Sequence, residues 1–189
     1  MTKGKRTIAG IIIFVALSTV FFLSHVHAAA PTNGLVGYWN FNEGSGTTAG
    51  DTSGNNNNGA LTNGPTWTSG KVGSGAVSFD GTNDYVDLGN PNSLIPGSGI
   101  TMSAWIKLSS TSGNQFVIAK DDSTAPVNDT FIRYQANTGI FCEVGGTGAA
   151  IATNVSTGVW YHWACTYDGA NIISYVNGAE IHINGGEHV

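Results

Sequence analysis

The chain has 189 residues, of which 41% are hydrophobic and only 10% are charged, and its formal net charge is −5. This length accommodates one ordinary domain. After residue 30, only Lys71, Lys107, Lys120 and Arg133 stand against twelve Asp and Glu, so this part of the chain has a net charge near −8. Because such a surface repels phosphate backbones, the composition argues against nucleic-acid binding.

Residues 1–30 have the features of a secretory signal peptide. Three basic residues open the chain, and the apolar run Ile8–Leu23 is followed by small residues. This order predicts export and a mature domain over residues 31–189, located outside the cell or at its surface. The alternative is an uncleaved membrane anchor, for which the run is short, since a span needs ~20 apolar residues. Membrane contact is expected only through an uncleaved leader.

The rest of the chain is predicted to form short strands separated by turns. No window of eleven or more residues repeats its apolar positions at helical spacing, whereas short alternation of apolar and polar residues recurs. Asn-Gly and Asp-Gly dipeptides accept positive φ angles and therefore indicate tight turns. They occur at 33–34, 58–59, 63–64, 80–81, 168–169, 177–178 and 184–185.

Strands are expected from near the start of the domain to its end. The segments are 35–41, 75–80, 84–89, 100–109, 115–121, 130–136, 139–146, 159–169 and 171–181. Two of them lie around Asp80-Gly81, and the last two are expected to form a hairpin at Asp168-Gly169. In 100–109, alternation places Met102 on one face and Trp105 on the other. Roughly ten short strands with regular turns predict an all-β fold, a two-sheet antiparallel β-sandwich.

The segment 51–64 (DTSGNNNNGALTNG) is rich in Asn, Asp and Gly. Only about 20 residues of the mature domain precede it, and this is too few for a separate domain. The segment is therefore predicted to be an ordered connecting loop rather than a linker between domains.

Asp51, Ser53, Asn55 and Asn57 have side-chain oxygen at alternate positions of this loop, as in an EF-hand. An EF-hand is excluded, because Asn and Thr replace its required Gly and bidentate Glu. Two alternatives stay open. One is a Ca²⁺ site of another shape with Asp51, Asn55 and Asn57 as ligands, of which Asp51 is the best single candidate. The other is a turn made of residues that tolerate left-handed backbone.

Cys142 and Cys165 are the only cysteines. In an exported protein, two thiols form a disulfide more often than a catalytic pair, which predicts a bridge between these strand-like segments. Two buried free thiols are the alternative. No arrangement of Cys and His has zinc spacing.

Four segments form an ordered set: GLVGYWNFNEGSGTTAGDTSGNNNNGALTNGPTW, GAVSFDGTNDYVDLG, ITMSAWIKL and WYHWACTYDGANIISYVNGAEI. Together they resemble the laminin-G-like jelly-roll domains of the concanavalin-A-like lectin/glucanase superfamily, over residues 34 to about 184. The resemblance implies a jelly roll of two antiparallel sheets. It also implies a non-catalytic module that binds glycans or surface proteins, in many cases with calcium. Such domains continue after the 171–181 hairpin, so we expect missing last strands and a fragment of a larger multidomain protein.

Few residues are suited to catalysis. A retaining glycosidase needs two carboxylates about 5 Å apart, and the closest group is Asp80, Asp84 and Asp87. Asp84 and Asp87 have odd spacing and so point to opposite strand faces, while Asp80 is predicted to form a turn. His162 is predicted to be a half-buried strand residue. We therefore expect no enzyme, with a glycoside hydrolase of the same superfamily and a structural spacer as the alternatives.

Aromatic residues occur in most of the expected strands. Seven are assigned to the core: Trp39, Phe41, Phe79, Trp105, Trp160, Trp163 and Tyr167. Trp67 and Tyr85 flank loops and are the better candidates for stacking on a sugar ring. The expected function is a rigid scaffold that presents loops for adhesion or glycan binding.

Overall fold

The computed structural model describes residues 33–95, 97–120, 130–152 and 154–183. The predicted leader at 1–30 and the expectation about strands after the last hairpin lie outside the described residues. Within the described ranges the secondary structure is β, apart from one 3-10 turn, η1 (Asn92–Leu94). The predicted all-β fold is confirmed. None of the helical structure in these ranges is long and apolar enough to cross a membrane.

Thirteen strands occur in the described part of the chain. They are β1 (Thr48–Ala49), β2 (Gly59–Thr62), β3 (Thr66–Thr68), β4 (Ala76–Ser78), β5 (Tyr85–Asp87), β6 (Ile100–Lys107), β7 (Asn114–Lys120), β8 (Thr130–Gln135), β9 (Gly139–Val144), β10 (Thr147–Ala152), β11 (Trp160–Tyr167), β12 (Ile172–Val176) and β13 (Ala179–Ile183). The described ladders are all antiparallel, with strand orders β1-β2-β5, β3-β4, β10-β9-β8-β7 and β13-β12-β11-β6.

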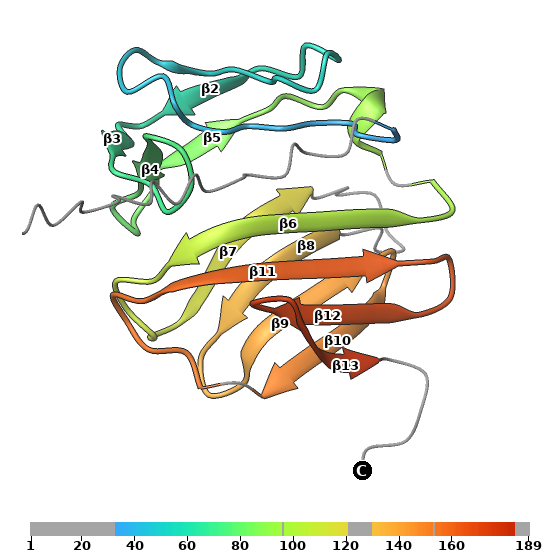
Figure 1. Cartoon of the computed structure of the whole chain (residues 1–189). Coiled ribbons are helices and arrows are strands. Elements are labelled where there is room, and N and C mark those ends of the chain that lie inside the picture. Colours follow the sequence, from blue (N-terminus) through green and yellow to red (C-terminus); the bar gives the residue numbers. More distant parts are fainter. Residues whose placement is uncertain (1–32, 96, 121–129, 153, 184–189) are drawn as a thin grey trace, which may run out of the picture. The chain divides into compact units, whose positions relative to one another are not determined.

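The two four-stranded sheets form the sandwich. Figure 1 shows the sheet of β6, β11, β12 and β13 and the sheet of β7 to β10. Both contribute to one hydrophobic core, whose buried members are Met102, Leu108, Ile132, Tyr134, Ile140, Cys142, Val144, Trp163, Cys165, Ile172 and Val176. Burial of these side chains stabilises the fold, at roughly 25 cal/mol for each Å² of apolar surface removed from water. The predicted sandwich is therefore confirmed, and the β1-β2-β5 and β3-β4 sheets are additions to it.

The alternation of β6 decides which of its side chains enter the core. Met102 is 6% exposed, whereas Trp105 is 40% exposed on the opposite face, as the sequence pattern predicts. On β11, which pairs with β6, Cys165 lies opposite Met102 and His162 lies opposite Trp105. The two strands thus share one inner face and one outer face.

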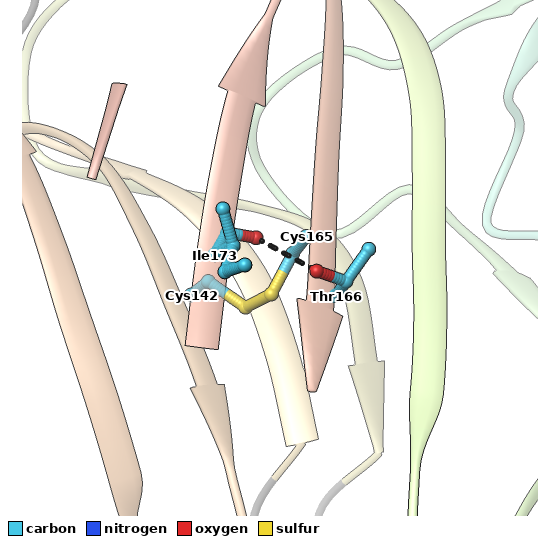
Figure 2. Close-up of a disulfide and its surroundings, with 4 residues drawn as sticks. All are labelled: Cys142, Cys165, Thr166 and Ile173. Atoms are coloured by element: carbon cyan, nitrogen blue, oxygen red, sulfur yellow. Dashed lines mark hydrogen bonds between the residues drawn. A yellow bond between two sulfur atoms is a disulfide. The ribbon is translucent and has the colours of Figure 1, made fainter. Parts of the chain in front are cut away.

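The predicted disulfide between Cys142 and Cys165 is confirmed (Figure 2). Its Cα atoms lie 6.5 Å apart, on β9 and β11. Because these strands belong to different sheets, the bridge ties the two layers of the sandwich together. Neither cysteine exposes more than 1% of its surface.

The expected strand at 35–41 does not form a ladder. Its β contact among the described residues is an isolated bridge between Trp39 and Asp51. The N–H of Tyr38 donates to Oδ1 of Asp51 over 2.9 Å, and the carbonyl of Tyr38 accepts the N–H of Thr52 over 2.9 Å. The strand prediction is wrong here, because alternation of apolar and polar residues does not show whether another strand lies alongside to pair with. The segment is held instead by hydrogen bonds to the loop that follows β1.

The strands around Asp80-Gly81 form but do not pair with each other, since β4 pairs with β3 and β5 pairs with β2. The hairpin at Asp168-Gly169 does form, between β11 and β12. Strand β10 is absent from the sequence prediction because its small residues conceal any alternation. The signal that indicates it is Gly145-Gly146, whose φ angles of 59° and 78° suit a tight hairpin turn.

Candidate functional site

The loop after β1 is organised around the carboxylate of Asp51. Oδ1 accepts the backbone N–H of Tyr38 at 2.9 Å and that of Ser53 at 2.8 Å. Oδ2 accepts the Ser53 hydroxyl at 2.8 Å and the N–H of Asn57 at 2.9 Å. A carboxylate has roughly four lone-pair positions, and each oxygen here accepts two hydrogen bonds. Asp51 therefore closes the loop and fixes it to the segment that precedes β1.

Asn55 and Asn57 bind the same preceding segment through their amide groups. Nδ2 of Asn55 donates to the carbonyl of Leu35 at 2.9 Å, and Nδ2 of Asn57 donates to the carbonyl of Val36 at 2.8 Å. Asn57 is only 6% exposed, and its Oδ1 accepts the Ser93 hydroxyl at 2.9 Å. The predicted order of the 51–64 segment is confirmed, and residues 51–58 form a loop. The prediction of a loop is wrong for Gly59–Thr62, which form β2 and pair with β1 and β5.

These contacts bear on the calcium prediction. Both oxygens of Asp51 and Oδ1 of Asn57 already accept hydrogen bonds, so an ion would have to displace their donors. The described residues contain no group of three or more His, Cys, Asp or Glu suited to a metal ion. As arranged, the set suits a hydrogen-bonded turn rather than an ion. Calcium binding by Asp51, Asn55 and Asn57 stays a prediction.

The same contacts lower the pKa of Asp51 below its ordinary value of 3.8. Partial burial acts to raise this pKa. The N–H groups of Ser53, Tyr38 and Asn57 and the Ser53 hydroxyl stabilise the charged form and prevail over that effect. The folded loop thus favours an ionised Asp51.

The carboxylates of Asp80, Asp84 and Asp87 each accept a hydrogen bond from a backbone N–H of a nearby residue. Oδ1 of Asp80 accepts the N–H of Thr82 at 2.8 Å, and this bond is the main cause that lowers the pKa of Asp80. Oδ2 of Asp84 accepts the N–H of Asp80 at 3.0 Å. Oδ1 of Asp87 accepts the N–H of Gly89 at 2.8 Å. The predicted turn-forming role of Asp80 is confirmed.

Aromatic side chains lie on the outer face of β6 and β11, where Trp105 is exposed and Trp160 and His162 are half-buried. In the strand register His162 is opposite Trp105, and Trp160 is opposite Lys107. The ring centroids of Trp105 and His162 are 5.3 Å apart, with an interplanar angle of 55°. We call these four residues the aromatic face. His162 is half-buried, as predicted.

Trp105 and Phe79 do not belong to the core, to which the sequence analysis assigned them. They are 40% and 48% exposed. For Trp105 the reason is the strand period, because Met102 and Trp105 are three residues apart on β6 and face opposite sides. The assignment of Trp163 is confirmed, since it is 1% exposed.

The remaining core candidates, Trp39, Phe41, Trp160 and Tyr167, are half-buried. Of the two residues predicted to be available for sugar stacking, Tyr85 is 47% exposed, as expected. Trp67 is half-buried and donates its indole N–H to the carbonyl of Gly46 at 2.8 Å. Alternation in β6 was the signal that could have identified Trp105 as an exposed ring.

The sheet of β7 to β10 also has rings on its outer face, but they surround an arginine. The guanidinium carbon of Arg133 lies 4.9 Å from the ring centroids of both Phe131 and Phe141. Nη2 of Arg133 donates to Oε1 of Gln135 at 2.9 Å. Phe116, on β7, is 56% exposed beside this group. The stacking and the bond to Gln135 hold Arg133 in place within its own sheet.

Comparison with known proteins places the chain in a family. A laminin-G-type model of the concanavalin A-like lectin/glucanases superfamily matches residues 80–188, more than half of the chain, so the chain belongs to this superfamily. The fold is also similar to a crystal structure of residues 221–444 of an S-layer domain-containing protein from Clostridium thermocellum. That match has a TM-score of 0.50 and 26% sequence identity, and it covers 78% of this chain and 71% of the other. No curated protein matches the chain.

Proposed function

We propose that the chain is a non-catalytic carbohydrate-recognition module of a secreted or surface protein. The observation behind the proposal is the aromatic face, where Trp105 is 40% exposed and its ring lies 5.3 Å from that of His162. Amphipathic rings of this kind stack on the apolar faces of sugars. Because paired strands hold them rigidly, little conformational entropy is lost when a ligand binds.

The comparisons support a location at the cell surface. The superfamily is named for lectins as well as glucanases. The similar crystal structure comes from a protein described as S-layer domain-containing. By analogy with that protein, we infer that this chain is a module of a larger surface protein. The analogy concerns the fold, so the ligand is argued from the aromatic face alone.

The arrangement of carboxylates supports binding rather than hydrolysis. A glycoside hydrolase needs an acid and a second carboxylate placed together across the scissile bond. Asp80, Asp84 and Asp87 instead each accept a backbone N–H within a turn. Hydrogen bonds to backbone N–H groups stabilise the charged form of a carboxylate, whereas a general acid must be protonated near neutral pH.

A glycan array probed with the full chain and with Trp105→Ala tests the proposal. We expect binding by the full chain and a loss of about 5- to 30-fold in Trp105→Ala, or ~1–2 kcal/mol. Phe116→Ala is the matched control, because it removes a 56% exposed ring from β7 in the other sheet. Equal losses in both variants would contradict the role of the aromatic face.

A turnover assay on the array's glycans separates the alternatives. We expect no new reducing ends, and their appearance would favour the hydrolase. An absence of both binding and turnover would favour the structural spacer.

A further inference from the structure

Three of the four basic residues after residue 30, Lys71, Lys107 and Arg133, lie next to aromatic rings. After residue 30 there are four Lys and Arg against twelve Asp and Glu. Nζ of Lys71 lies 5.7 Å from the ring centroid of Trp105, and Nζ of Lys107 lies 5.0 Å from that of Trp160. Lys107 therefore lies on the aromatic face and Lys71 lies beside it, so this surface is locally basic although the chain as a whole is acidic.

The two cation–ring pairs form a short row. Trp105 and Lys107 are two residues apart on β6, which corresponds to about 7 Å along the strand. Lys71 reaches Trp105 from the connection between β3 and β4, whereas Lys107 lies directly across from Trp160. One ligand chain lying along β6 and β11 would meet both rings and both ammonium groups.

The neighbouring positions on these strands contain no carboxylate. The outer-face residues of the β6 and β11 register are Thr101, Ser103, Trp105, Lys107, Trp160, His162, Ala164 and Thr166. The first acidic residue across the sheet is Glu180 of β13, opposite Tyr175 of β12. The hydroxyls of Thr101, Ser103 and Thr166 are of the kind that bond to sugar hydroxyls.

The two lysines keep the capacity to bind an anion. A cation–π contact of a solvent-exposed ammonium contributes only about 0.5–1 kcal/mol, and all three N–H donors of the ammonium stay available for acceptors. Arg133 differs, because it lies over the rings of Phe131 and Phe141 and is bonded to Gln135. Charge complementarity therefore selects the aromatic face as the place for an anionic ligand.

We propose that the aromatic face binds an acidic polysaccharide. Its carboxylate or sulfate groups pair with Lys71 and Lys107, and its sugar rings stack on Trp105 and Trp160. This inference rests on the proposed carbohydrate-binding function and specifies the chemical class of the ligand. An acidic protein segment would satisfy the charges, but it would leave the two indole rings without sugar faces to stack on.

Affinity gel electrophoresis of the full chain tests the inference, with polygalacturonate, dextran sulfate or neutral dextran in the gel. We expect retardation by polygalacturonate, dextran sulfate or both, with the responding gel showing which anion is preferred. Binding should weaken as NaCl rises from 0.05 to 1 M, because salt screens the ion pairs. The variant Lys71→Gln with Lys107→Gln should bind about tenfold more weakly, since two exposed pairs are lost.

Lys120→Gln is the control for loss of a lysine elsewhere in the chain, because Lys120 lies on β7 and bonds to the side chain of Asn90. Its binding should equal that of the unchanged chain. Retardation by neutral dextran alone, unaffected by the lysine changes, would overturn the acidic ligand and leave the carbohydrate function standing. Binding to no glycan would overturn both. Equal binding to poly-glutamate that persists in Trp105→Ala would overturn the inference in favour of an acidic protein.

Discussion

Asp51→Asn changes the single group around which the loop after β1 is organised. The substitution keeps the shape of the side chain but removes its charge and replaces one oxygen with an NH₂ group. In the native loop each oxygen accepts two hydrogen bonds. In the variant, the two donors that bonded to the replaced oxygen face the new NH₂ group, which is itself a donor. The two hydrogen bonds to the remaining oxygen lose the contribution of the negative charge.

The expected loss follows from these four contacts. A hydrogen bond to a charged group contributes about 1.5–3 kcal/mol, and an exposed one lies at the lower end. Two bonds become repulsive and two weaken, while rearrangement of the loop and access of water recover part of the loss. We expect the free energy of unfolding to fall by about 2–3 kcal/mol.

Urea unfolding of the full chain at pH 7, followed by tryptophan fluorescence, measures this loss. Asp87→Asn is the matched control, because Asp87 accepts one backbone N–H, from Gly89. The control should lose less than about 1 kcal/mol. Equal losses in the two variants would refute the view that Asp51 organises its loop.

The same variant separates the two explanations of the loop. If Asp51, Asn55 and Asn57 hold calcium, added CaCl₂ raises the Tm, EDTA reverses the rise, and Asp51→Asn abolishes it. If Asp51 serves only the backbone and Ser53, neither reagent changes the Tm. The four hydrogen bonds to its carboxylate favour the second result.

Two further predictions concern stability. Replacing Cys142 and Cys165 with Ala should lower the free energy of unfolding by about 3 kcal/mol, because their separation of 23 residues constrains the unfolded chain, and a loss below ~1 kcal/mol would contradict this. Acid should also destabilise the fold. The pKa of Asp168 is lowered mainly by the N–H of Asn171, and the pKa of Asp51 is lowered by the donors of its loop. The two ionised carboxylates therefore stabilise the fold above pH 3.8, their ordinary pKa, and this stabilisation is lost as the pH falls through their lower pKa values in the folded protein. The pH series should fall less steeply in Asp51→Asn, and an unchanged slope would count against a lowered pKa for Asp51.

Several features could be predicted from local patterns. The alternation around Met102 predicted both faces of β6, because the period of a strand is a property of the backbone. The Asp168-Gly169 turn predicted the β11–β12 hairpin, since that turn and its two strands are contiguous. The disulfide could be predicted from the predicted export of the protein and from the presence of two cysteines alone.

Other features depended on residues far apart in the sequence. The strands around Asp80-Gly81 each pair with an earlier strand, and the turn dipeptide contains no information about those partners. Trp105 was assigned to the core although its position in β6 indicated the outer face, because aromatic residues are common in both places. Its contact with Lys71 comes from a different connection and has no local signature.

The sequence by itself determined the all-β class, the period of the longer strands, the chemistry of the turns and the pairing of the two cysteines. The first three are properties of short segments, and the pairing follows from there being only two cysteines. The tertiary structure decided that Asp51 bonds to Tyr38, Ser53 and Asn57, and that lysines from separate segments lie beside the indole rings of Trp105 and Trp160. Such contacts require the chain to bring distant segments together, and the pairing of strands and the burial of the core determine which segments meet.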